Sequence, residues 1–212
     1  MRRSISIFIS LFIMVAPLSG LTAPASAASK ADLDASVKTA AAFMLQTVRN
    51  PQVGSVGGEW AVIGLARSGH DVPDSWFEGY YRTVELHVRE RGGVLHDVRY
   101  TDYSRVILGL TAAGYDPRDV AGYDLTLPLG DFERTIRQGI NGPIFALIAL
   151  DSLSYPVPAN SDAQTQATRD MYVAEILRRE IPGGGWNLTA GAGGTAVSEN
   201  ERGDPDITGM AL

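Results

Sequence analysis

Most residues that could take part in binding or catalysis lie at the start of short apolar segments or just before them. Trp186 instead lies in a Gly-rich turn. The full set is Glu59, Trp60, Tyr100, Asp102, Tyr103, Asn141, Trp186, Asp204 and Asp206. Carboxylates, an amide and aromatic rings at such positions can hold a small ligand through hydrogen bonds and ring contacts. A carboxylic acid kept protonated by its neighbours can also donate a proton. The sequence therefore suggests a binding site, or an acid centre, assembled from separate segments.

The apolar segments beside these residues are internal repeats. Residues 61–69 read AVIGLARSG and residues 106–114 read VILGLTAAG, with looser copies at 146–150 and 208–212. Each copy is small, apolar and compatible with a helix. Self-similarity at a period of roughly 40 residues is typical of helical repeat folds.

Two kinds of helix alternate along the chain. Amphipathic patterns with a polar face predict helices over 30–49, 74–91, 131–138 and 165–180. Segments that are apolar nearly all round predict helices over 59–68, 102–113, 144–153 and from 206 onward. Because a helix that is apolar on every side must be buried on every side, the alternation predicts an all-α fold with inner and outer layers of stacked helical hairpins.

Two further segments carry weaker signals. The Gly-rich stretch 183–203 lacks the Gly-Lys-Ser/Thr ending of a phosphate loop, so we interpret it as a flexible connection. Arg178 and Arg179, which lie among Glu175 and Glu180, indicate a solvated helix face.

Several motifs together resemble the prenyltransferase and squalene-oxidase repeat of the terpenoid cyclase and protein prenyltransferase superfamily. They are residues 59–60 with the repeat that follows, 100–105, 138–143, 182–186 and 204–212. The likeness is strongest to the exported Gram-positive branch, which is similar to the α/α-barrel domain of transcobalamin and intrinsic-factor proteins. This resemblance implies an α/α toroid over residues 28–212. A full barrel of this kind has six helical hairpins, so about seven helices and the start of an eighth imply a partial toroid. Truncation would explain this, and the alternative is a short form that closes by dimerising.

The same resemblance implies an exported, non-catalytic barrel domain that binds a small molecule, a corrinoid such as cobalamin, at the barrel mouth. Unpaired N–H groups at helix N-termini favour polar or anionic ligand groups there. Asp102, Asn141, Asp204 and Asp206 could instead cap their own helices. Trp186, in its Gly-rich turn, is expected to pack against successive outer helices as much as to contact a ligand.

Residues 204–208 favour a different, enzymatic interpretation. They resemble the Asp-x-Asp-Asp-Thr acid motif of class II terpene cyclases, which implies that Asp206 would donate the proton. Ile207 stands where the final acid would be, and its loss removes the partner that tunes such an acid. The resemblance is also compatible with a relative of the prenyltransferases. A cell-surface scaffold or adhesion module, with a downstream domain or cell-wall partner, is a third interpretation, and it requires no catalysis.

The N-terminus predicts export. Arg2 and Arg3 precede an apolar run over 5–16, and Ala25-Ser26-Ala27 gives a cleavage pattern, so residues 1–27 are interpreted as a signal peptide of a secreted or cell-surface protein. The run is too short to span a bilayer. A net charge of −6 argues against nucleic-acid partners, and the chain has no cysteine for disulfides or thiolate zinc sites. Its three histidines show no metal-ligand spacing.

Overall fold

The computed structural model describes residues 29–55 and 57–212, so the predicted signal peptide over 1–27 lies outside the described residues. The described residues form α1 (Lys30–Thr47), α2 (Glu59–Arg67), α3 (Asp74–Glu90), α4 (Tyr100–Ala112), the 3-10 segment η1 (Leu127–Gly130), α5 (Phe132–Ile136), α6 (Asn141–Asp151), α7 (Arg169–Arg178), the 3-10 segment η2 (Ala192–Gly194) and α8 (Pro205–Ala211). Among them there is no sheet, only isolated bridges such as Asp131 with Gln166. The all-α prediction is confirmed.

Side chains in the sequence start and stop these helices. Ser29 and Asp32 form a capping box at α1, and Thr168 accepts a hydrogen bond from the backbone N–H of Met171 at the start of α7. At the end of α4, Gly114 takes a φ of +85°, which a residue without a side chain adopts at little cost. This turn lets the N–H of Tyr115 donate to the carbonyl of Leu110 at 2.9 Å.

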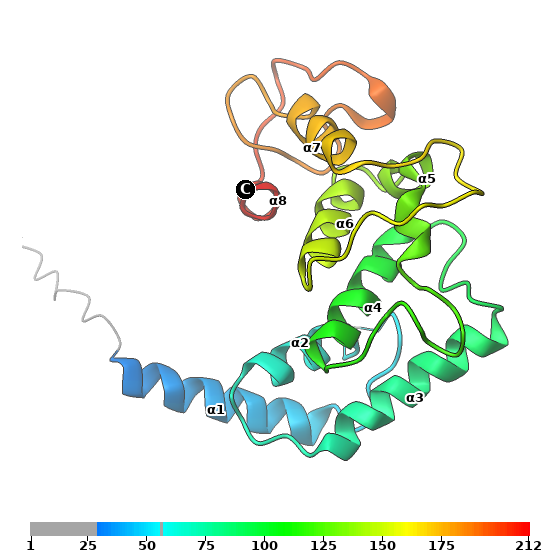
Figure 1. Cartoon of the computed structure of the whole chain (residues 1–212). Coiled ribbons are helices and arrows are strands. Elements are labelled where there is room, and N and C mark those ends of the chain that lie inside the picture. Colours follow the sequence, from blue (N-terminus) through cyan, green and yellow to red (C-terminus); the bar gives the residue numbers. More distant parts are fainter. Residues whose placement is uncertain (1–28, 56) are drawn as a thin grey trace, which may run out of the picture.

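The helices alternate between two layers, as the repeat predicts. Helix α4 packs against α2 on one side and α6 on the other, and α8 packs against α6. Figure 1 shows these four helices along the inner side of an open arc, with α1, α3, α5 and α7 along its outer side. The main core lies between the layers and includes residues of α2, α3, α4, α6 and α7, such as Val62, Tyr80, Ile107, Leu150 and Tyr172.

The expectation that the inner helices are buried on every side is wrong. Helix α8 has no buried residue, and Trp60 of α2 and Ile148 of α6 keep exposed fractions of 46% and 40%. The reason is geometric, because an inner helix of an open arc has one face on the core and another on the concave side. At the outer layer, α1 buries only Ala41.

The boundaries of several elements also differ from prediction. Helices α4 and α6 begin at Tyr100 and Asn141, two and three residues early, and η1 has no counterpart among the predicted helices. The amphipathic pattern predicts that the last long outer helix begins at residue 165, yet residues 165–168 are not helical, and the N–H of Phe132 donates to the carbonyl of Thr165. No described helix combines the length and apolar content needed to cross a bilayer.

Candidate functional site

A cavity of about 360 Å³ lies where α2, α4 and α6 begin, and we call it the mouth cavity. Its lining residues are Gly54, Trp60, Arg99, Thr101, Asp102, Arg105, Asn141 and Phe145. Three of the sequence-predicted residues, Trp60, Asp102 and Asn141, therefore meet here from three successive inner helices. Their convergence follows from the repeat, which places equivalent helix starts side by side.

Asp102 pairs with two arginines in the wall of the mouth cavity. Its carboxylate is almost fully buried, accepts from Arg99 Nε at 3.0 Å and also pairs with Arg105. The alternative prediction that Asp102 caps its helix is wrong, because it lies within the first turn of α4 and its oxygens face arginines at i−3 and i+3. Two guanidinium groups against one carboxylate leave the lining of the cavity with a surplus positive charge, which the buried carboxylate of Glu59 beneath Arg105 offsets in part when it is ionised.

Aromatic and amide groups complete the mouth cavity. Trp60 meets Phe145 edge to face, with ring centroids 6.1 Å apart, and almost half of Trp60 stays exposed. Asn141 Oδ1 and Arg105 Nε are buried and have no hydrogen-bond partner among the described residues. Unpaired polar atoms of this kind are uncommon in protein interiors, so both atoms lack a partner that the described residues do not supply.

Glu59 lies beneath this region and is fully buried, although it does not line the mouth cavity. Its Oε1 accepts from the N–H of Gly54 at 2.8 Å and from the hydroxyl of Tyr80 at 3.4 Å, which ties the preceding loop to α2 and α3. Burial raises the pKa of Glu59, against the opposing effects of the Gly54 N–H and of Arg105. Glu59 therefore supports the site from below.

Replacing Glu59 with glutamine is expected to stabilise the protein at neutral pH. The pKa of Glu59 is higher in the folded state than its ordinary value of 4.5. Below pH 4.5 the carboxyl is protonated in both the folded and the unfolded state and does not reduce stability. The free energy of unfolding then falls as pH rises through the pKa of the folded state. Glutamine keeps the acceptor oxygen without the charge. Thermal unfolding across the range from acidic to neutral pH should show a gap in melting temperature that opens as pH rises. Glu90→Gln, at an exposed position, is the control, and an equal gap in both variants would contradict the assignment.

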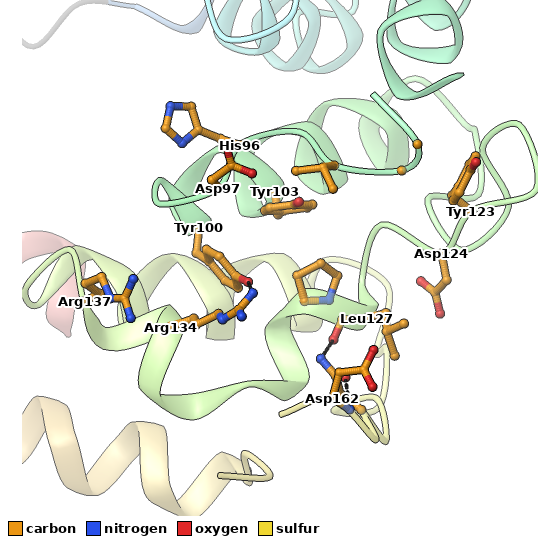
Figure 2. Close-up of a pocket in the computed structure, with 15 residues that line it drawn as sticks. His96, Asp97, Tyr100, Tyr103, Tyr123, Asp124, Leu127, Arg134, Arg137 and Asp162 are labelled. Carbon is orange, nitrogen blue, oxygen red and sulfur yellow. Dashed lines mark hydrogen bonds between the residues drawn. The ribbon is translucent and has the colours of Figure 1, made fainter. Parts of the chain in front are cut away.

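Tyr100 and Tyr103 do not join the mouth cavity. They line a larger pocket of about 620 Å³ on another face of α4, shown in Figure 2. Arg134 donates to the hydroxyl of Tyr100 at 3.1 Å, and the hydroxyl of Tyr103 accepts from the N–H of Leu95 at 3.0 Å. In Figure 2, Arg134 lies beside Tyr100 and Asp124 lies on the far side of the pocket. The sequence-based prediction groups both tyrosines with Asp102, but a helix turns by about 100° per residue and so separates their side chains.

Trp186, Asp204 and Asp206 lie elsewhere. Trp186 is buried and donates from Nε1 to the carbonyl of Ile176 at 2.7 Å, and its ring packs among residues of α6, α7 and α8, so it contacts two inner helices and one outer helix rather than successive outer helices. Asp204 caps α8 by accepting from the N–H groups of Asp206 and Ile207, both at 2.9 Å. Asp206 is solvent exposed. Both acids line a separate cavity beside Leu188.

Sequence reasoning missed Arg99, Arg105 and Phe145 as mouth residues. The spacing of the two arginines around Asp102 is a signal that could have found them, since residues three apart on a helix are neighbours. Among the described residues no group of three or more His, Asp or Glu side chains could hold a metal ion. Comparison with family models, curated proteins and solved structures gives no match to this chain.

Proposed function

We propose that the chain is a non-catalytic binding module whose mouth cavity holds a small anionic ligand with an apolar or ring-shaped part. One observation carries this proposal: Trp60, the Asp102–arginine cluster and Asn141 reach one cavity from three consecutive inner helices. A volume of about 360 Å³ lies within the usual range for small-molecule pockets.

The chemistry of the lining selects the ligand class. Arg99 and Arg105 share a single carboxylate, so an incoming carboxylate or phosphate would balance their charge. The positive ends of the α4 and α6 dipoles add to this attraction. Trp60 and Phe145 offer an exposed aromatic edge on which a flat or apolar group can pack.

Because of the resemblance stated above, a corrinoid is the first ligand to test. The same resemblance implies that the two-layered arc is part of an α/α toroid and that the protein is exported. A corrinoid would place only part of its periphery in a cavity of this size. The cyclase alternative gains no support from the geometry, because Asp206 is solvent exposed and its neighbour Asp204 is engaged as a helix cap.

The proposal predicts that Trp60→Ala and Arg105→Gln each weaken ligand binding by about tenfold or more. Trp60→Ala removes the packing edge, whereas Arg105→Gln removes one positive charge from the cavity wall. Binding would be measured by titration calorimetry of the full chain with hydroxocobalamin, and with benzoate and phenyl phosphate as simple anionic ring compounds.

Arg82→Gln, an exposed arginine of α3, serves as the control and should bind as the unmodified chain does. Absence of heat with hydroxocobalamin at high micromolar concentration would remove the corrinoid. If none of the three compounds bound at about 10 mM, or if Arg82→Gln weakened binding equally, the mouth-cavity proposal would fail.

A further inference from the structure

A fourth cavity, of about 490 Å³, lies between the end of α5, helix α7 and the Gly-rich segment that follows α7. We call it the basic cavity. Its lining includes three arginines and two glutamates, namely Arg137, Arg178, Arg179, Glu133 and Glu175, together with the glycines Gly139, Gly193 and Gly194. It shares no lining residue with the mouth cavity.

Two arginines of the basic cavity depend on one carboxylate. Arg179 donates from Nε to Glu175 Oε1 at 2.7 Å, and Arg178 donates to both oxygens of Glu175 at 2.8 and 2.9 Å. Burial alone would raise the pKa of Glu175, but the hydrogen bonds from Arg178 and Arg179 hold it below its ordinary value. Glu175 is therefore ionised and already engaged by both guanidinium groups.

One donor of this cluster is buried without a partner. The side chain of Arg179 keeps only 2% of its surface exposed, and its Nη1 is buried without a hydrogen-bond partner among the described residues. Arg137 lines the same cavity from an exposed position. Glu133 accepts from the hydroxyl of Thr165, so one of its oxygens is also engaged. A buried N–H donor without a partner is unfavourable, and an anion in the cavity would also balance the excess of three guanidinium groups over two carboxylates in its lining.

The Gly-rich segment closes over the arginines. Arg178 donates to the carbonyl of Gly191 at 2.8 Å, and Gly191 has a φ of +64°. A Cβ on Gly191 would come within 3.1 Å of Arg178 Nη1 and 3.3 Å of Arg179 Cγ, so the absence of a side chain permits this close approach. The segment thus forms one wall of the cavity.

We propose that the basic cavity binds a phosphate group, held by the guanidinium groups of Arg179 and Arg137. A guanidinium presents its N–H donors in a fixed planar fork that matches phosphate oxygens. The arginines here would supply the positive charge that the lysine of a phosphate loop supplies elsewhere.

The test is titration of the full chain with inorganic phosphate at constant ionic strength, followed by calorimetry and by the Nε–H NMR signals of arginine. We expect saturable binding and a shift of the Arg179 Nε–H signal. Arg137→Gln should weaken binding by about tenfold, and Glu133→Gln should strengthen it several-fold because it removes a nearby negative charge. Neither position is part of the buried Arg179–Glu175 pair, so both variants should fold.

Arg82→Gln and the mouth variant Arg105→Gln are the controls, and both should leave the phosphate dependence of the Arg179 Nε–H signal unchanged, since phosphate bound in the mouth cavity does not reach this arginine. Failure of the mouth proposal would therefore leave this result intact. Methyl phosphate that binds at least as tightly as inorganic phosphate would identify an ester as the ligand, whereas weaker binding would identify the free ion. No saturable binding at about 20 mM phosphate, or equal weakening in Arg82→Gln, would overturn the proposal.

Discussion

Replacing Gly142 with alanine is expected to destabilise the protein by about 3 kcal/mol. Gly142 lies in the first turn of α6, where its backbone passes against the end of α5. A Cβ at this position would overlap the carbonyl oxygen of Thr135, and the obstacle is backbone that cannot rotate away. One added methyl group must therefore push apart two packed helices in the middle of the arc.

Gly79→Ala is the matched control for this prediction. Gly79 lies within α3, and a Cβ there would meet no atom within 4 Å. Alanine in a helix interior is favoured over glycine, so this variant should gain about 0.5–1 kcal/mol. Urea unfolding followed by helical circular dichroism would compare the two midpoints with that of the unmodified chain. Equal midpoints for Gly142→Ala and the unmodified chain would show that α5 and α6 can separate without cost.

The contrast between these glycines shows what the sequence could and could not predict. Apolar repeats predict the inner helices α2, α4 and α6 to within a few residues, and Gly69 and Gly114 predict the ends of α2 and α4, because helical periodicity and C-terminal glycines are local signals. The segment containing Gly142 is recognisable as a motif. Its close approach to Thr135 depends on how α5 packs on α6, which no local pattern encodes.

The candidate sites show the same division. The repeat predicts that Trp60, Asp102 and Asn141 lie at equivalent helix starts, and the structure brings them to one cavity. Tyr100 and Tyr103 belong to the same segment as Asp102 but line a different pocket. Residues that are adjacent in the sequence of a helix point in different directions around its axis, so they can line different cavities.

Arg178 and Arg179 show how tertiary structure overrides a local pattern. Their acidic neighbours predict a solvated helix face, and this is wrong for Arg179, which is 1% exposed. The physical reason is the Gly-rich segment after α7, which folds back so that Arg178 reaches the carbonyls of Gly191 and Thr195. A segment whose composition indicates a connection thus determines the environment of the helix before it.

Replacing Glu175 with leucine is expected to destabilise the protein by about 4 kcal/mol, because it leaves the buried guanidinium of Arg179 without its only ionic partner among the described residues. Arg178→Met is the comparison. It removes the partly exposed arginine of the same cluster, and it should cost only about 1 kcal/mol because the buried carboxylate of Glu175 keeps its bond to Arg179. The double variant Glu175→Leu/Arg179→Met removes both buried charges, so it should be more stable than Glu175→Leu alone.

The pH dependence separates this charge effect from simple loss of packing. Because the pKa of Glu175 is lowered in the folded state, its stabilising contribution is present above the ordinary value of 4.5 and is lost as pH falls through the folded value. The difference in unfolding free energy between the unmodified chain and Glu175→Leu should therefore be largest near neutral pH and shrink on acidification. A difference that does not change with pH, or a double variant no more stable than Glu175→Leu, would mean that leucine fails for steric reasons. For Glu59 we expect the opposite dependence, because burial raises its pKa. As pH rises, ionisation of Glu175 increases the free energy of unfolding, whereas ionisation of Glu59 decreases it.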